Sequence, residues 1–324
     1  MGRALLVGLS HYDNQIPPLK GCVNDALGMK AVLSTHEDGS PNYECLTLVS
    51  PGPQPVTRKL LRKYWSGLFD NYDEDILFYF SGHGHPTDIG GYLVTQDAET
   101  GDPGLSMNDL LALANKSSAR SVLLILDCCF AGWLGDPSVL QSDRSIENRA
   151  LLRKGLTILA ASRPQQTAGE AGGLGVFTGL VIGALKGGAA DVRGNVTAAA
   201  VYGYVEQALG EWEQRPAYKT HAYRFSPIRR CKASVPDALL RGLPDIFDKK
   251  ADSPFQLDPS FEFTHESAMP AHVELFNKLK VLRNARLLST EGDKDLYFIA
   301  LESKSVWLTP LGRFYWQLAR DRRI

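Results

Sequence analysis

The chain has 324 residues, of which 44% are apolar and 22% are charged, with a formal net charge of −1. This composition is typical of a soluble globular protein, and the near-neutral charge argues against nucleic acid or an anionic membrane as the main partner. Five irregularly spaced cysteines fit neither a disulfide framework nor a zinc ribbon, so we expect a cytoplasmic location. No stretch approaches the ~20 apolar residues that a membrane span needs, so no membrane partner is expected.

Apolar runs and amphipathic patterns alternate along the first two thirds of the chain. Strands are predicted within residues 3–12, 45–50, 75–85, 91–98, 121–132 and 155–163. Helices are predicted within residues 25–35, 53–70, 106–116, 176–187 and 197–212. Strands that alternate with helices predict an α/β fold, with a mostly parallel sheet of about six strands flanked by helices on both faces.

Two of the predicted strands end in chemically active residues. The segment DILFYFSGHGH (75–85) carries His83, and SVLLILDCCFAG (121–132) carries Cys128 and Cys129. The carboxyl ends of parallel strands meet at one edge of a sheet, where ligands bind in open α/β folds. A histidine that takes the proton of a nearby thiol turns it into a strong nucleophile. The pair therefore indicates a cysteine hydrolase, although a buried Cys pair can also serve packing alone.

The strings YFSGHG and LDCCFAG resemble the two catalytic motifs of the caspase–metacaspase clan of cysteine peptidases. His83 lies 46 positions before Cys129, close to the ~50 residues typical of caspases. The animal-caspase string Q-A-C-x-G is absent, whereas Asp127, Cys129 and Gly132 match the metacaspase-like pattern D-x-C-x-x-G. Two thiols compete for the nucleophile's role, and the spacing favours Cys129. The resemblance implies a caspase-like peptidase domain over residues 1–232.

By this resemblance, Cys129 is the nucleophile of a Cys–His dyad and His83 is its general acid and base. His85 is a rival two positions further on, but the family's histidine is the one between the two glycines. The backbone N–H groups of Gly84 and Cys129 would form the oxyanion hole.

The resemblance also implies an acidic primary pocket formed by Asp25 and Asp127, with Cys22 in its wall. Two carboxylates in one pocket favour a cation, and the arginine fork can engage both of them. We therefore expect cleavage of protein substrates after Arg or Lys. Two alternatives stay open: Asp25 as a helix cap, and Asp127 as a carboxylate that positions the active-site loops.

No cofactor is expected to be required, but some metacaspases bind Ca²⁺ near the strand that carries the histidine. Hard oxygen ligands for such a site would be Asp97, Asp102, Asn108 and Asp109. Solvated loop acids are the alternative explanation.

The segment after the nucleophile, residues 135–155, is charged, and in this clan the corresponding loop is often cut during activation. Arg144, Arg149 and Arg153 are the candidate cleavage sites, although a merely solvated loop would also be charged. An activating protein partner is the other predicted trigger. The family includes members in cell-death and anti-phage defence systems.

The sequence changes character after residue 232. Residues 233–264 hold four prolines and read as a connector. Residues 265–324 are predicted as a helix, two short strands (within DLYFIALES and SVWLTP) and a second helix, which resembles a winged-helix module. Its acidic and basic residues are nearly balanced, so we expect a regulatory or partner-binding module rather than a DNA reader. A catalytically silent scaffold and a winged-helix regulator are the alternatives to a peptidase.

Overall fold

The computed structural model describes residues 1–87, 90–128, 152–161, 170–171, 173–209, 216–221, 226–247 and 250–324. The chain divides into two compact units. The first contains residues 1–190 and 195–231, and the second contains residues 191–194 and 232–324.

The first unit is built on a six-stranded sheet with the strand order β12-β8-β7-β3-β1-β2. These strands are β1 (Gly2–Leu9), β2 (Tyr43–Ser50), β3 (Asp75–Ser81), β7 (Ser121–Asp127), β8 (Leu156–Ala160) and β12 (Ala217–Thr220). Only β12, at one edge, runs antiparallel to its neighbour. The predicted mostly parallel α/β sheet is therefore confirmed. The central strands form from unbroken apolar runs because both of their faces are buried.

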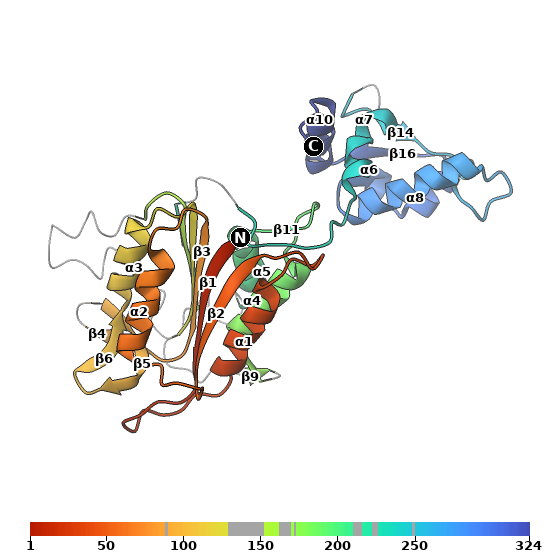
Figure 1. Cartoon of the computed structure of the whole chain (residues 1–324). Coiled ribbons are helices and arrows are strands. Elements are labelled where there is room, and N and C mark those ends of the chain that lie inside the picture. The colour runs from red at the N-terminus through yellow and green to blue at the C-terminus, as the bar shows by residue number, and fades with distance from the viewer. Residues whose placement is uncertain are drawn as a thin grey trace. The chain divides into compact units, whose positions relative to one another are not determined.

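Helices cover both faces of this sheet (Figure 1). One face carries α2 (Arg58–Phe69) and α3 (Met107–Lys116), and the other carries α1 (Cys22–Leu33), α4 (Val176–Gly183) and α5 (Ala198–Leu209). A π-helical turn, Ala184–Gly188, continues α4. Alternate residues of β3 enter opposite cores: Phe78 packs with Trp65 of α2, whereas Tyr79 packs with Phe177 of α4. The strand's period of two thus places Tyr79 on the face that α4 covers.

Small sheets complete the first unit. The strands β4 (Gly84–Thr87), β5 (Gly90–Glu99) and β6 (Asp102–Ser106) form an antiparallel sheet directly after the histidine strand. Two-stranded pairs join β9 (Glu170–Ala171) to β10 (Leu174–Gly175) and β11 (Asn195–Val196) to β13 (Arg229–Arg230). The segment β10 leads directly into α4.

The second unit has its own apolar core around a three-stranded sheet with the order β14-β16-β15. Its elements are α6 (Asp237–Arg241), α7 (Leu243–Ile246), β14 (Phe255–Gln256), a 3₁₀ turn (Pro259–Phe261), α8 (Pro270–Asn284), β15 (Leu288–Thr290), a 3₁₀ turn (Glu291–Asp293), α9 (Leu296–Leu301), β16 (Ser305–Leu308) and α10 (Pro310–Arg320).

Two features of this unit differ from the sequence-based expectation. Residues 233–264, predicted as a connector, contribute α6, α7 and β14, and the side chains of Val235, Leu243 and Phe261 lie in the core. The strand predicted within DLYFIALES is wrong: Leu296–Leu301 is a helix, whose first turn is capped by the Asp295 carboxylate accepting from the Tyr297 N–H. The winged-helix prediction is not confirmed.

Within the described part of the chain, no helix combines the length and the apolar character needed to cross a membrane.

We expect residues 1–231 to fold without residues 232–324, because the two cores that flank the large sheet draw their buried side chains from residues before 232. Val192 belongs to the core of the second unit and would become exposed, so the deletion is best made together with Val192→Ser. A soluble product with a cooperative thermal transition is the expected result. If the full-length protein is well behaved but the deletion is insoluble both with and without Val192→Ser, the result would contradict this expectation.

Candidate active site

The carboxyl ends of β1, β3 and β7 lie in register with one another, at the end of the sheet where the parallel strands terminate. Gly8 of β1 pairs with Ser81 of β3, and Ser81 pairs with Asp127 of β7. His83 follows Ser81 by two positions, and Cys129 follows Asp127 by two positions. The described residues reach Cys128, which is buried, whereas Cys129 and Gly132 lie outside them. The two motifs thus begin from paired positions on neighbouring strands.

His83 is held by the loop that follows β1. Its Nε2 lies 2.8 Å from the carbonyl oxygen of Pro17, and its backbone N–H donates to the Tyr12 hydroxyl at 2.8 Å. A carbonyl oxygen only accepts, so Nε2 carries the proton and the neutral imidazole has its lone pair on Nδ1. Burial raises the pKa of Tyr12, which therefore stays a neutral phenol. Nδ1 is the atom of His83 that can take up a proton.

Asp25 is buried in the first turn of α1, with 2% of its surface exposed. Helix α1 begins at Cys22, and Gly21 precedes it without a side-chain cap, so Asp25 is not the helix cap of the alternative interpretation. Its Oδ2 accepts from the Ser81 hydroxyl at 2.8 Å, and its Oδ1 accepts from the Gly175 N–H at 2.9 Å. Asp25 therefore connects the carboxyl end of β3 to the start of α4 through two hydrogen bonds.

Gly8 brings the start of α1 against the end of β1. A Cβ on Gly8 would lie 2.1 Å from the carbonyl oxygen of Cys22, so only glycine permits this approach. The close contact carries Cys22 and Asp25 to the strand ends, although they follow a loop rather than a strand.

Asp127 and Asp25 converge on Gly175. A Cβ built on Gly175 would lie 3.1 Å from Asp127 Oδ2 and 3.2 Å from Asp25 Oδ2. Asp127 Oδ2 accepts from the Thr178 hydroxyl of α4 at 2.7 Å. The two carboxylates predicted from the sequence thus lie close together, in the space that a side chain at position 175 would occupy.

Cys22 lies beside this pair of carboxylates. Burial, together with the negative charges of Asp25 and Asp127, raises the pKa of the Cys22 thiol to about 11. At neutral pH the group is almost entirely a protonated thiol, which is a poor nucleophile. This state suits a wall residue rather than a second nucleophile.

Several residues of this region were not singled out from the sequence. Pro17 and Tyr12 orient His83, and Ser81, Gly175 and Thr178 bind the two carboxylates. Ser81 belongs to the SGHG string, so that motif carried a signal for it, whereas Gly175 and Thr178 lie outside both quoted motifs. The contact made by the Pro17 carbonyl has no side-chain signature.

The other residues of the histidine motif lie on the short strand β4. Gly84 pairs with Leu93, and His85 is exposed and pairs with Tyr92. An exposed His85 on β4 agrees with a residue at the rim.

The four predicted calcium ligands contact several different groups of the protein. Asp102 forms an ion pair with Arg58, and Asp109 lies 3.5 Å from Arg62. Asp97 Oδ1 accepts from the Arg58 N–H at 2.8 Å, and the backbone N–H of Asn108 donates to the hydroxyl of the cap residue Ser106 at 3.2 Å. Among the residues that the structure describes, no group of three or more His, Cys, Asp or Glu side chains could hold a metal ion. Calcium binding stays a prediction without support from this arrangement.

Arg153 is the one candidate cleavage site within the described residues; Arg144 and Arg149 lie outside them. Its guanidinium donates to the carbonyl oxygens of Ala114, Ala119 and Lys154 at 2.7–2.9 Å. Cleavage after Arg153 would require these bonds to break.

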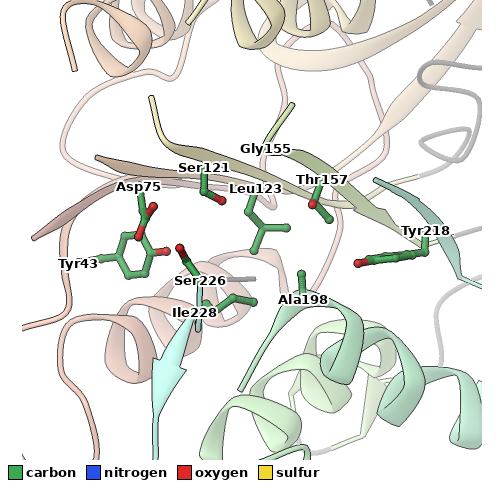
Figure 2. Close-up of a pocket in the computed structure, with 10 residues that line it drawn as sticks. All are labelled: Tyr43, Asp75, Ser121, Leu123, Gly155, Thr157, Ala198, Tyr218, Ser226 and Ile228. Carbon is green, nitrogen blue, oxygen red and sulfur yellow. The ribbon is translucent and has the colours of Figure 1, made fainter. Parts of the chain in front are cut away.

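A separate small cavity of about 30 Å³ lies near the amino ends of the strands, where it is lined by Asp75, Ser121, Thr157, Tyr43 and Tyr218, among others (Figure 2). This volume suits one or two water molecules. None of the predicted site residues lines the cavity, so it is distinct from the candidate active site.

Comparison with known proteins places the chain in a family. The model of the caspase domain family matches residues 1–225. The chain therefore belongs to the caspase domain family, a family of cysteine peptidases.

Two relatives illustrate the similarity. Metacaspase-1A of Aspergillus oryzae (strain ATCC 42149 / RIB 40) is 33% identical over 96 residues, which cover 28% of this chain and only 22% of that protein. The crystal structure of caspase-1 from Spodoptera frugiperda superposes with a TM-score of 0.50 at 13% identity, covering 71% of this chain and 90% of that chain. At that identity, the second similarity concerns the fold alone.

Proposed function

We propose that this protein is a cysteine endopeptidase that cuts protein substrates after Arg or Lys, with Cys129 as nucleophile and His83 as general acid and base. Membership in the caspase domain family supports the peptidase activity. The observation that carries the specificity is the convergence of Asp25 and Asp127 on Gly175.

The electrostatics around these carboxylates support a cationic substrate group. Burial and the charges of Asp127 and Asp25 raise the pKa of Tyr79 well above its usual value, as they raise that of Cys22. Both shifts report a negative field that adds to burial. Two desolvated carboxylates repel each other, so a guanidinium between them is stabilised by both.

The pairing of Ser81 with Asp127 on neighbouring strands supports a reaction in which the groups that follow these two residues act together. His83 Nδ1 takes the proton of the Cys129 thiol, and the thiolate attacks the carbonyl carbon of the peptide bond. The backbone N–H groups of Gly84 and Cys129 would stabilise the oxyanion. His83 then donates its proton to the departing amine, and water hydrolyses the thioester, which returns the free thiol and releases the acid.

A panel of fluorogenic peptides that differ only in the residue before the cut bond tests this function. We expect turnover with Arg, weaker turnover with Lys, and none with Asp, measured with and without added Ca²⁺. Arg is favoured because its planar fork can bind two carboxylates, whereas the Lys ammonium is a point charge. Preferential cleavage after Asp would contradict the acidic pocket. If a thiol probe labels Cys129 but the protein cleaves none of the peptides, the result would contradict a peptidase that is active without an activation step.

Regulation is a further part of the proposal. Activation by a protein partner, or by cleavage between residues 135 and 155, would give the second unit or that loop a role, and a cell-death or anti-phage pathway would fit such control. Partner binding to the second unit is favoured by its exposed aromatic side chains, among them Phe263, Phe298 and Phe314.

A further inference from the structure

We propose that Thr178 and Tyr79 are positioning residues that hold the Asp127 carboxylate in the orientation needed to select Arg over Lys. This inference rests on the proposed function and deepens it. Tyr79 lies on β3 and Thr178 in the first turn of α4, and neither is exposed to solvent.

The direction of the hydrogen bonds follows from simple chemistry. Thr178 Oγ1 lies 2.7 Å from Asp127 Oδ2 and 2.6 Å from the Tyr79 hydroxyl. An ionised carboxylate only accepts, so the single hydroxyl proton of Thr178 is donated to Asp127. Thr178 must then accept from Tyr79. The result is a buried chain of donors, Tyr79 to Thr178 to Asp127, that ends on one particular carboxylate oxygen.

This chain fixes how the Asp127 carboxylate is rotated. A terminal carboxylate torsion is soft, so a carboxylate without a fixed donor samples a broad range of angles. Thr178 binds Oδ2 from α4 and is fully buried, and Tyr79 on β3 belongs to the apolar core that α4 covers. The Tyr79 hydroxyl lies 2.6 Å from Thr178 Oγ1, so it occupies an acceptor position of Thr178 and favours the orientation in which Thr178 donates to Oδ2.

The same turn of α4 serves the second carboxylate. The N–H of Gly175, the residue that precedes α4, donates to Asp25 Oδ1, and the Thr178 hydroxyl donates to Asp127 Oδ2. Donors from the positive end of a helix favour the charged form of each acid, which opposes the mutual repulsion of the pair. The start of α4 thus places both carboxylates relative to one backbone segment.

The consequence concerns geometry more than charge. The arginine guanidinium is planar and binds carboxylates through parallel N–H bonds, so its affinity depends on the rotation of the carboxylate. The lysine ammonium is a compact point charge that tolerates a rotated partner. Loss of the Thr178 hydroxyl should therefore weaken Arg substrates more than Lys substrates, while the negative charge of Asp127 remains.

The test measures kcat/KM for matched Arg and Lys peptides in four variants. Thr178→Val removes the hydroxyl and keeps the shape, and we expect a fall of about 10-fold for Arg and less than about 3-fold for Lys. Tyr79→Phe should shift the Arg-to-Lys ratio in the same direction by a smaller factor, since Thr178 can still donate. Thr178→Ser keeps the hydroxyl and should restore most of the selectivity. Ile182→Val, elsewhere on the same helix, controls for repacking and should lower kcat/KM for both substrates by the same factor.

The thermal unfolding midpoint of each variant is measured in parallel. An unchanged Arg-to-Lys ratio in an active Thr178→Val enzyme, or an equal fall for both substrates that follows the unfolding midpoint, would overturn the positioning role and leave the proposed function standing. If Thr178→Val does not fold, the ratio measured for Tyr79→Phe decides in the same way. A wild-type enzyme that does not cleave after Arg would overturn the proposed function, and this inference with it.

Discussion

We expect Cys129→Ala and His83→Ala each to abolish peptide cleavage, and Cys128→Ala to retain much of it. The first two changes remove the proposed nucleophile and the proposed base, which would act as one unit, so each alone should lower kcat by a factor of at least about 10⁴. Cys128 is 5% exposed and belongs to the apolar core, so we expect its thiol to serve packing rather than attack. The measurement is the turnover of an Arg peptide by each variant.

Thermal unfolding of the three variants is the control, since a loss of activity counts only for a folded protein. Labelling by a thiol-reactive probe gives a second, independent readout: it should disappear in Cys129→Ala and persist in Cys128→Ala. An inactive Cys128→Ala together with an active Cys129→Ala would show that the nucleophile is the first thiol of the pair.

We expect Asp25→Ala to lower kcat/KM for Arg peptides by about 100-fold or more and to leave the proposed Cys–His pair intact. Removal of one partner of a desolvated, hydrogen-bonded charge pair costs roughly 2–5 kcal/mol, which corresponds to a loss of this size. The reaction rate of Cys129 with a small, uncharged thiol reagent should stay close to the wild-type value, because such a reagent does not use the pocket.

Two controls separate specificity from stability. Asp25 accepts from the Ser81 hydroxyl and the Gly175 N–H, so its loss leaves two buried donors unsatisfied and lowers the stability by about 1–3 kcal/mol. Asp25→Asn keeps an acceptor for one of these donors and removes the charge, so it should be more stable than Asp25→Ala but equally poor with Arg. Glu99→Ala, an exposed acid on β5, is the matched control and should change neither property. Full activity of Asp25→Asn toward Arg would argue against the acidic pocket.

Much of the fold could be predicted because the central strands consist of continuous apolar runs in the sequence. Residues 75–81 and 121–127 are buried on both faces, so neither run needs the alternation of a half-exposed strand. Parallel pairing then places the residues after both strands at one edge, and the motifs SGHG and D-x-C-x-x-G name the chemistry there. The candidate site could therefore be proposed from the sequence at the level of His83, the cysteine pair and the strand ends.

The second unit was less predictable because its signals are local and weak. The segment DLYFIALES is rich in aromatic and branched residues that favour a strand, yet the cap at Asp295 and packing in the core of the unit make it a helix. The prolines of residues 233–264 indicated a connector, but short helices between them bury Leu240, Leu243 and Phe247. Tertiary burial outweighed local preference in both places.

The sequence by itself determined the mostly parallel sheet, and it supplied the histidine and the acids of the candidate site as predictions to be tested. Only the tertiary structure decided how those acids are held. Gly175 reaches Asp25 across 150 positions of sequence, and Thr178 reaches Asp127 across 51. The physical reason is that a hydrogen-bond partner is chosen by the packing of α4 against the sheet, and the residues that meet there share no sequence period. The orientation of His83 by the Pro17 carbonyl is of the same kind, because a backbone oxygen leaves no mark in the sequence.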